Sequence, residues 1–218
     1  MREMLGKSLC TVALLAAAIP LSQDLTPLMH PEAPAFTAAA PAESVVRLET
    51  TKGNIDIAVT RAWAPRGADR FVALVRAGYY DGNRLFRVRP GYWWQFGING
   101  DPAVAKVWRG QTIPDDPFVQ SNVKGTVAFA FAVPNGRTTQ IFFNLRDNSS
   151  THDKEPFTPF GKVVAGMDVL DALNAEHGEG PGGIRAGKQD PFFDGGNAWL
   201  DKNFPRLDVI TRASVLGR

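Results

Sequence analysis

Hydrophobic residues recur at every second position near the start of the region that spans residues 44–218. Between Val45 and Val59 this alternation runs on both sides of Lys52-Gly53-Asn54, a triplet typical of tight turns. It predicts a β-hairpin, because successive side chains of a strand point to opposite faces. Leu207 to Val215 predicts a closing strand. Shorter strands are expected around 84–89, 92–98, 125–132 and 140–145.

Two segments show helical spacing instead. Pro65 to Ala77 places apolar residues on one face, has proline near its first turn and is followed by Gly78, which favours a helix over this range. Gly166 to Asn174 predicts a second helix. Residues 177–196 are rich in glycine and predict an irregular excursion, with Asn197 as a candidate cap for a short helical turn. Many short strands with two helices predict a mainly-β protein, a closed antiparallel barrel with helices over its ends.

The N-terminal residues differ from the rest of the chain. Leu9 to Ile19 is apolar, Arg2 and Lys7 precede it, and Pro20 ends it. The apolar run is shorter than the roughly 20 residues of a membrane-spanning helix. Residues 1–22 are therefore predicted to be a signal peptide, or an N-terminal anchor if uncleaved, that exports the protein to the periplasm or beyond. A buried core helix is the alternative.

Residues 23–43 are rich in Pro and Ala and lack periodicity, which predicts a flexible linker. The folded domain is then expected to span residues 44–218. At 218 residues and 44% hydrophobic content, the chain suits one domain with a sizeable core.

Composition and charge exclude several classes of function. A net charge of +2 without a basic run does not indicate a nucleic-acid partner. Cys10 is the only cysteine, so no internal disulfide can form. The three histidines have no metal-ligand spacing, and the glycine-rich run after His177 lacks the G-K-[ST] ending of a phosphate loop. No metal site or cofactor is expected.

Two segments carry the most specific signal. Residues 85–97 read LFRVRPGYWWQFG, and residues 139–144 read TQIFFN. Together they resemble the two signature segments of cyclophilins, the peptidyl-prolyl cis-trans isomerases. Further matches follow in the family's order at 77–82 (AGYYDG), 125–130 (GTVAFA) and 160–171 (FGKVVAGMDVLD). The resemblance covers residues 45–215 and implies eight strands and two helices. The C-terminal tail resembles one bacterial branch of the family.

The resemblance implies isomerisation of X-Pro bonds in unfolded or extended polypeptides by a monomer. Rotation about such a bond crosses a barrier of about 18–20 kcal/mol that arises from amide resonance. As the bond twists, the prolyl nitrogen regains its lone pair, and a fixed cation that donates a hydrogen bond withholds that pair from resonance. Arg87 matches the family's catalytic arginine. Arg89 is a rival, because it shares the face of the strand with Arg87.

The remaining site residues follow from the same resemblance. Gln95 matches a glutamine that holds the substrate backbone, and Phe142 matches the floor of the proline pocket. The other residues matched to substrate binding are Phe86, Tyr92, Trp93, Phe129, Ala130, Phe131, Ala132, Gln140 and Phe157. Of these, Phe86, Phe131 and Phe157 replace residues usual in the family, a His, an Asn and a His. These replacements bear on substrate preference more than on the reaction.

Two alternatives remain open at this point. A cyclophilin-like module could bind proline-containing segments without turnover, which Phe86, Arg89 and Phe131 favour. A structural domain could instead present Trp93, Trp94 and Trp108 as an exposed aromatic patch for a partner.

Overall fold

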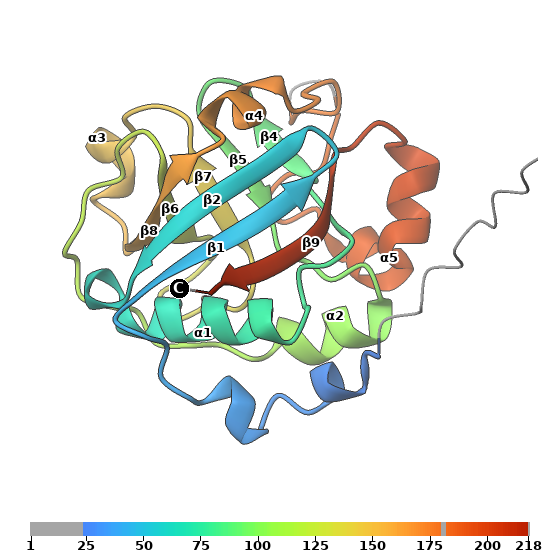
Figure 1. Cartoon of the computed structure of the whole chain (residues 1–218). Helices are drawn as coiled ribbons and strands as arrows, with labels where there is room; N and C mark the ends of the chain where they lie inside the picture. Colours follow the sequence, from blue (N-terminus) through green and yellow to red (C-terminus); the bar gives the residue numbers. More distant parts are fainter. Residues whose placement is uncertain (1–23, 180–181, 218) are drawn as a thin grey trace, which may run out of the picture.

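Nine strands form one curled antiparallel sheet in the computed structural model, which describes residues 24–179 and 182–217 (Figure 1). The expected signal peptide lies outside these residues. The sheet has the order β3-β9-β1-β2-β8-β6-β7-β5-β4. The strands are β1 (Glu43–Thr50), β2 (Gly53–Thr60), β3 (Asn83–Arg84), β4 (Arg87–Arg89), β5 (Trp93–Phe96), β6 (Thr126–Phe129), β7 (Ile141–Asn144), β8 (Pro159–Ala165) and β9 (Val209–Leu216).

The closed eight-stranded barrel predicted from the sequence is wrong. The ladder has nine strands, and its two edges, β3 and β4, do not pair with each other. These edges are nevertheless consecutive in the chain, separated only by Leu85 and Phe86. Leu85 still donates its N–H to Asp208 O at 3.0 Å, beside β9, whereas β4 pairs with β5. The single strand expected at 84–89 is therefore split into β3 and β4. The short connection between them joins the two edges of the sheet.

The predicted hairpin is confirmed as β1 and β2, which pair from Glu43 with Thr60 to Thr50 with Gly53. The two predicted helices are confirmed as α1 (Pro65–Arg76) and α4 (Met167–Ala172). Strand β8 and helices α2 (Pro102–Arg109) and α3 (Ser149–His152) were not predicted, and of α5 (Asp190–Asn203) only a short helical turn at Asn197 was expected. Within the described ranges, no helix combines the length and apolar character that crossing a membrane requires.

Helix α5 begins inside the stretch that glycine content assigned to an irregular excursion. It continues through Gly195 and Gly196 with a kink at Gly196, where φ is 56°. A side chain at Gly196 would meet Gly100 O at 2.2 Å, so glycine allows the helix to approach the chain before α2. Asn197 lies within α5 and does not cap it; its Nδ2 donates to Gly82 O at 3.0 Å.

The hydrophobic core lies on the inner face of the curled sheet, over which α1 packs (Figure 1). Val88, Trp94, Phe143 and Val127 are paired in a row across four strands and are all buried. Trp108 is buried as well. The exposed patch of Trp93, Trp94 and Trp108 is therefore excluded, since two of its three members lie in the core.

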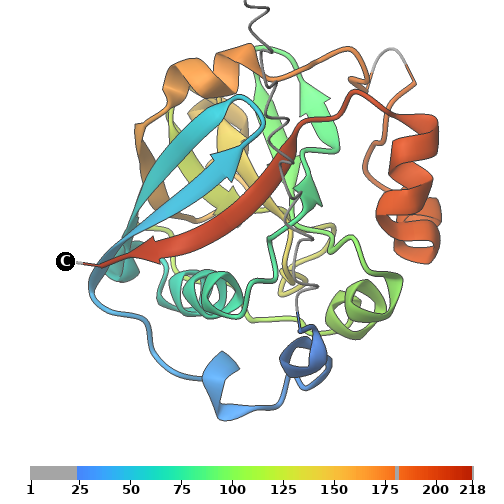
Figure 2. The same ribbon diagram turned by 45° about the vertical axis from the view of Figure 1, so that its right-hand side comes forward.

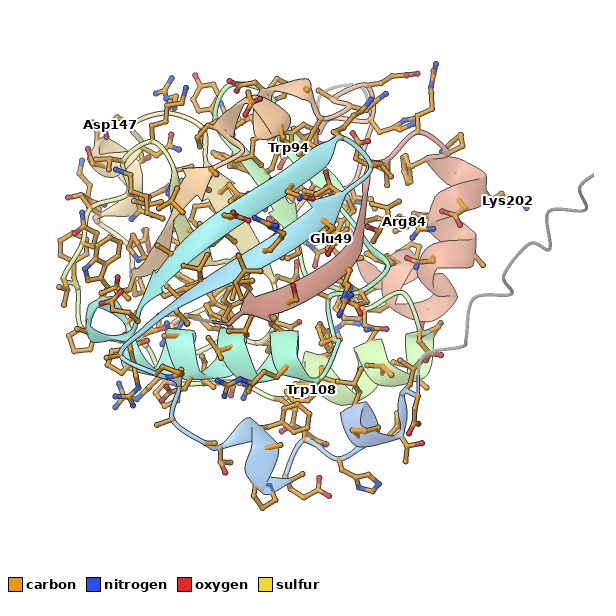
Figure 3. The ribbon with its side chains drawn as sticks, viewed as in Figure 1. Glu49, Arg84, Trp94, Trp108, Asp147 and Lys202 are labelled. Atoms are coloured by element: carbon orange, nitrogen blue, oxygen red, sulfur yellow. The ribbon has the colours of Figure 1, made fainter. Side chains whose placement is uncertain are left out.

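Residues 24–42 pack on the domain below α1 and α2 (Figure 2). Leu28 is fully buried, and its carbonyl accepts a 2.7 Å hydrogen bond from Trp108 Nε1. The Phe36 ring meets Trp108 edge-on, with ring centroids 4.8 Å apart. Figure 3 labels Trp108 between this segment and the helices above it. Where composition predicted a flexible linker, the structure thus has a packed segment. Its few apolar side chains are irregularly spaced, because they pack individually against the core and do not form one face of a helix or strand.

Candidate active site

Three predicted site residues form a row across adjacent strands. Arg87 on β4 is paired with Gln95 on β5, and Gln95 is paired with Phe142 on β7. Residues directly opposite in neighbouring antiparallel strands project from the same face, with strands about 4.8 Å apart. This row alternates with the buried row of Val88 and Trp94, so it lies on the outer face of the sheet.

A chain of hydrogen bonds fixes the polar part of this row. Arg87 Nη1 donates to Gln95 Oε1 at 2.6 Å, and Gln95 Nε2 donates to Gln140 Oε1 at 2.6 Å. The amides of Gln140 and Gln189 lie 3.0–3.1 Å apart. At the other end, Arg87 Nε donates to the carboxylate of Glu179. The guanidinium is held at two of its three nitrogens.

An apolar cleft of about 250 Å³ adjoins this polar chain. The ring of Phe142 lies 5.4 Å from His152 and 5.5 Å from Phe157, and Phe131 packs on Phe157 at 4.3 Å. The cleft is lined by Arg87, Trp93, Gln95, Ala130, Phe131, Phe142, His152, Phe157 and Ala186. It combines a flat apolar floor with one cation, which suits a small saturated ring next to a polar bond.

A second cleft of about 200 Å³ shares Arg87, Gln95, Ala130 and Phe131 with the first. It continues past Ala132 and Gln140 to Arg109 on α2 and Phe193 on α5. The two clefts are therefore continuous along these shared residues and form one groove.

The structure brings together nine of the twelve predicted site residues in this groove: Arg87, Trp93, Gln95, Ala130, Phe131, Ala132, Gln140, Phe142 and Phe157. It does not bring in Phe86, Tyr92 or Phe129. Phe86 is buried against Phe192 of α5 with ring centroids 5.2 Å apart, and Phe129 packs in the core on Phe160. The split at 85–86 turns the ring of Phe86 away from the groove, and the alternation of side chains along β6 turns the ring of Phe129 away from it.

The cations near Arg87 have other contacts. The ring of Tyr92 contacts the guanidinium groups of both Arg89 and Arg146, whose Cζ atoms are 4.2 and 4.0 Å from its ring centroid. Arg89 is exposed and lines neither cleft, although it shares the face of β4 with Arg87. This geometry favours Arg87 over its rival as the residue that meets a ligand.

Sequence analysis missed several residues that the fold brings to the site, among them His152, Glu179, Ala186 and Gln189. His152 was set aside because the three histidines show no metal-ligand spacing, yet it forms a wall of the apolar cleft. Burial lowers the pKa of its imidazole, and Asp153 opposes that shift. No sequence signal identifies Glu179 or Gln189, which reach the site from a glycine-rich segment that lies about 90 to 100 residues beyond Arg87.

A buried network supports the groove from behind. Gly97 directly follows β5, and its carbonyl accepts a 2.7 Å hydrogen bond from Thr139 Oγ1. Tyr79 donates to Thr139 Oγ1 at 3.2 Å, and burial raises the pKa of Tyr79 to about 12. Tyr80 donates to Thr139 O at 3.0 Å. Since Gln140 follows Thr139, these bonds set the position of the polar chain in the groove.

Comparison with known proteins gives the same assignment as the motifs. The family model described as cyclophilin type peptidyl-prolyl cis-trans isomerase/CLD matches residues 45–189. The chain is 33% identical over 153 residues to peptidyl-prolyl cis-trans isomerase A of Dickeya dadantii, covering 68% of this chain and 80% of that protein. It is 30% identical over 142 residues to a peptidyl-prolyl cis-trans isomerase of Acinetobacter baylyi, covering 63% and 76%.

Solved structures show the same fold. A cyclophilin type peptidyl-prolyl cis-trans isomerase of Cryptosporidium parvum has a TM-score of 0.57 at 17% identity, covering 81% of this chain and 99% of that one. A second structure of that protein, obtained in the presence of the dipeptide ala-pro, has a TM-score of 0.55 at 18% identity and covers 80% and 99%. This chain belongs to the cyclophilin-type peptidyl-prolyl cis-trans isomerase family.

Proposed function

We propose that this protein catalyses cis-trans isomerisation of X-Pro bonds in unfolded or extended polypeptides, with Arg87 as the catalytic residue. The observation that carries the proposal is the row of Arg87, Gln95 and Phe142, which places a fixed cation beside an apolar floor on one face of the sheet. The family relatives, named as isomerases, support the same reaction.

The mechanism follows from the groove. The pyrrolidine ring rests on Phe142, between His152 and Phe157, and the chain before it lies along Ala130 to Ala132. Arg87 then donates a hydrogen bond to the prolyl nitrogen as that nitrogen becomes pyramidal. Only the twisted state offers a lone pair, so the contact lowers the barrier without stabilising the planar states equally. Each 1.36 kcal/mol gained this way is about a tenfold gain in rate.

The reaction breaks no covalent bond, so side chains alone are sufficient for this mechanism. Gln95 orients the guanidinium through its Oε1. Arginine suits the role because its charge does not change with pH and its donors lie in a rigid plane.

The test is a protease-coupled assay of a proline peptide with the full chain, the Arg87→Ala variant and the Arg89→Ala variant. We expect turnover by the wild type and by Arg89→Ala, and loss of most turnover in Arg87→Ala. A wild type that binds the peptide in titration but does not accelerate isomerisation would establish the alternative, a module that binds proline segments. Two of the three features that favoured that alternative, Phe86 and Arg89, lie outside the groove.

We also propose that the protein is an exported member of a bacterial branch of the family, acting as a monomer on polypeptide substrates without nucleic acid. The apolar run at Leu9 to Ile19, with Arg2 and Lys7 before it, supports export. Cell fractionation with mass spectrometry of the mature N-terminus tests this proposal. A cytoplasmic protein that begins at Met1 would refute export, and an uncleaved membrane-bound form would identify the segment as an anchor.

A further inference from the structure

We propose that Glu179 is a positioning residue for catalysis, which holds the Arg87 guanidinium in the orientation that the twisted prolyl amide requires. This inference rests on the proposed function of Arg87. Glu179 accepts a hydrogen bond from Arg87 Nε, and both side chains are largely buried, with 25% and 17% of their surfaces exposed. A charge-assisted hydrogen bond at a partly buried site is stronger than one at the open surface.

The backbone places Glu179 beside Arg87. Its N–H donates to Val88 O on β4 at 3.2 Å, directly after Arg87 in the chain. The preceding Gly178 packs closely on β4, since a side chain there would lie 3.4 Å from Val88 O. Gly183 donates to Gly178 O at 3.0 Å. The carboxylate therefore approaches from a backbone fixed to the same strand that carries Arg87.

The donors of Arg87 are divided between fixed partners and the groove. Arginine has five N–H groups on three nitrogens. Nε is taken by Glu179 and one donor of Nη1 by Gln95. Within residues 24–179 and 182–217, no hydrogen bond occupies either Nη2 donor or the second Nη1 donor, so these three donors are left for a substrate. Two contacts on different nitrogens fix the plane of the guanidinium, whereas Gln95 alone would allow rotation about its single hydrogen bond.

The same part of the chain also secures the other end of the polar row. Gln189, just before α5, exchanges hydrogen bonds with Gln140, which holds Gln95. Glu179 and Gln189 thus terminate the row on its two sides. A row held at both ends is pre-organised, so less ordering remains to occur in the transition state.

The experiment compares Glu179→Ala, Glu179→Gln and Glu176→Ala in the full chain. Glu176 is a matched control: it lies three residues earlier, has the same charge and pairs with Arg206 at the surface, away from the groove. We expect kcat of Glu179→Ala to fall about tenfold or more with KM little changed, because a misplaced donor affects the transition state more than binding. Glu179→Gln should retain most activity, since its amide oxygen still accepts from Nε. Glu176→Ala should match the wild type.

A second readout does not depend on turnover. The Nε–H resonance of Arg87, assigned by its absence in Arg87→Lys, should be protected from exchange in the wild type and lose that protection in Glu179→Ala. A kcat equal to or above the wild-type value in Glu179→Ala overturns the inference, because Glu179 would then be dispensable or would compete with substrate. Unchanged protection of Nε–H also overturns it. If Glu179→Ala fails to fold, Glu179→Asp replaces it, since the shorter carboxylate withdraws from Nε.

A wild type without turnover would refute the proposed function separately. The Nε–H resonance would still show whether Glu179 holds Arg87 in that case, so the two failures are distinguishable.

Discussion

The guanidinium of Arg87 lies at the junction of the two clefts, with its Cζ atom 5.7 Å from the centre of the Trp93 ring. Replacing Arg87 by Ala should lower kcat/KM by about 10- to 150-fold, because a hydrogen bond to a charged group contributes about 1.5–3 kcal/mol. Arg87→Lys should also be poor, because an ammonium group lacks the planar fork. The coupled assay measures both, and unfolding curves should show that the fold survives. Loss of activity in Arg89→Ala, with Arg87→Ala unaffected, would contradict this role.

Phe142 forms the apolar floor beside Arg87. Phe142→Ala should weaken binding of a proline peptide, since the pyrrolidine ring loses part of an apolar contact worth roughly 1.5–3 kcal/mol when such a side chain is fully buried. Titration of the proline peptide and its alanine analogue into wild type and variant tests this prediction. An equal loss for both peptides, or global unfolding of the variant, would mean that Phe142 serves core packing instead.

His152 makes stability depend on pH. Burial lowers the pKa of its imidazole below the ordinary value of about 6.5. At pH 7.5 the ring is largely neutral in both the folded and the unfolded chain, so it contributes little to this dependence. As pH falls below about 6.5 the unfolded chain binds the proton more readily, so the free energy of unfolding decreases.

The Tm of the wild type should therefore fall more between pH 7.5 and pH 5.5 than the Tm of His152→Asn. Affinity for the proline peptide should fall over the same range, because a charged ring would line the apolar cleft. Parallel pH profiles of the two proteins would refute this role of His152.

At the scale of elements, the end of β5 must approach the chain before β7 closely. Gly97 has φ of 112°, and a side chain there would lie 2.4 Å from Thr139 O. Gly97→Ala should therefore combine backbone strain with a clash and cost more than about 1 kcal/mol of stability. Because Gln140 follows Thr139, activity should also fall. Gly91→Ala is the control, since it shares a positive φ but has open space around it. Equal effects of the two substitutions would show that φ alone matters.

At the scale of the whole molecule, residues 24–42 belong to the folded unit. Leu28→Ala should reduce the free energy of unfolding by about 2–5 kcal/mol, because Leu28 is fully buried and its loss leaves a cavity beside Trp108. Met29→Ala should have little effect, since Met29 is exposed. Denaturant unfolding of both variants measures the difference. Identical stabilities would mean that this segment detaches from the domain in solution.

The sequence predicted elements well where the decisive neighbours are close in the chain. The hairpin of β1 and β2 and the helix α1 follow from periods of two and about 3.6 residues. Elements with weaker periods were missed, including the first half of α5, whose two glycines resemble a loop. Helix α5 forms where Phe192, Phe193 and Leu200 bury themselves with Phe86 and Ile184. That burial, and not local preference, outweighs the cost of glycine within a helix.

The order of motifs along the chain identified the family and predicted that Arg87, Gln95 and Phe142 belong to one site. The pairing of β4, β5 and β7 places these three residues in one row. Only the tertiary structure decided which way Phe86 and Phe129 point, that Trp108 is covered by residues 24–42, and that Glu179 meets Arg87. Each of these depends on contacts between residues far apart in sequence. Local periodicity reflects which face of an element is apolar. It carries no information on which distant segment covers that face, since packing of the whole chain selects that partner.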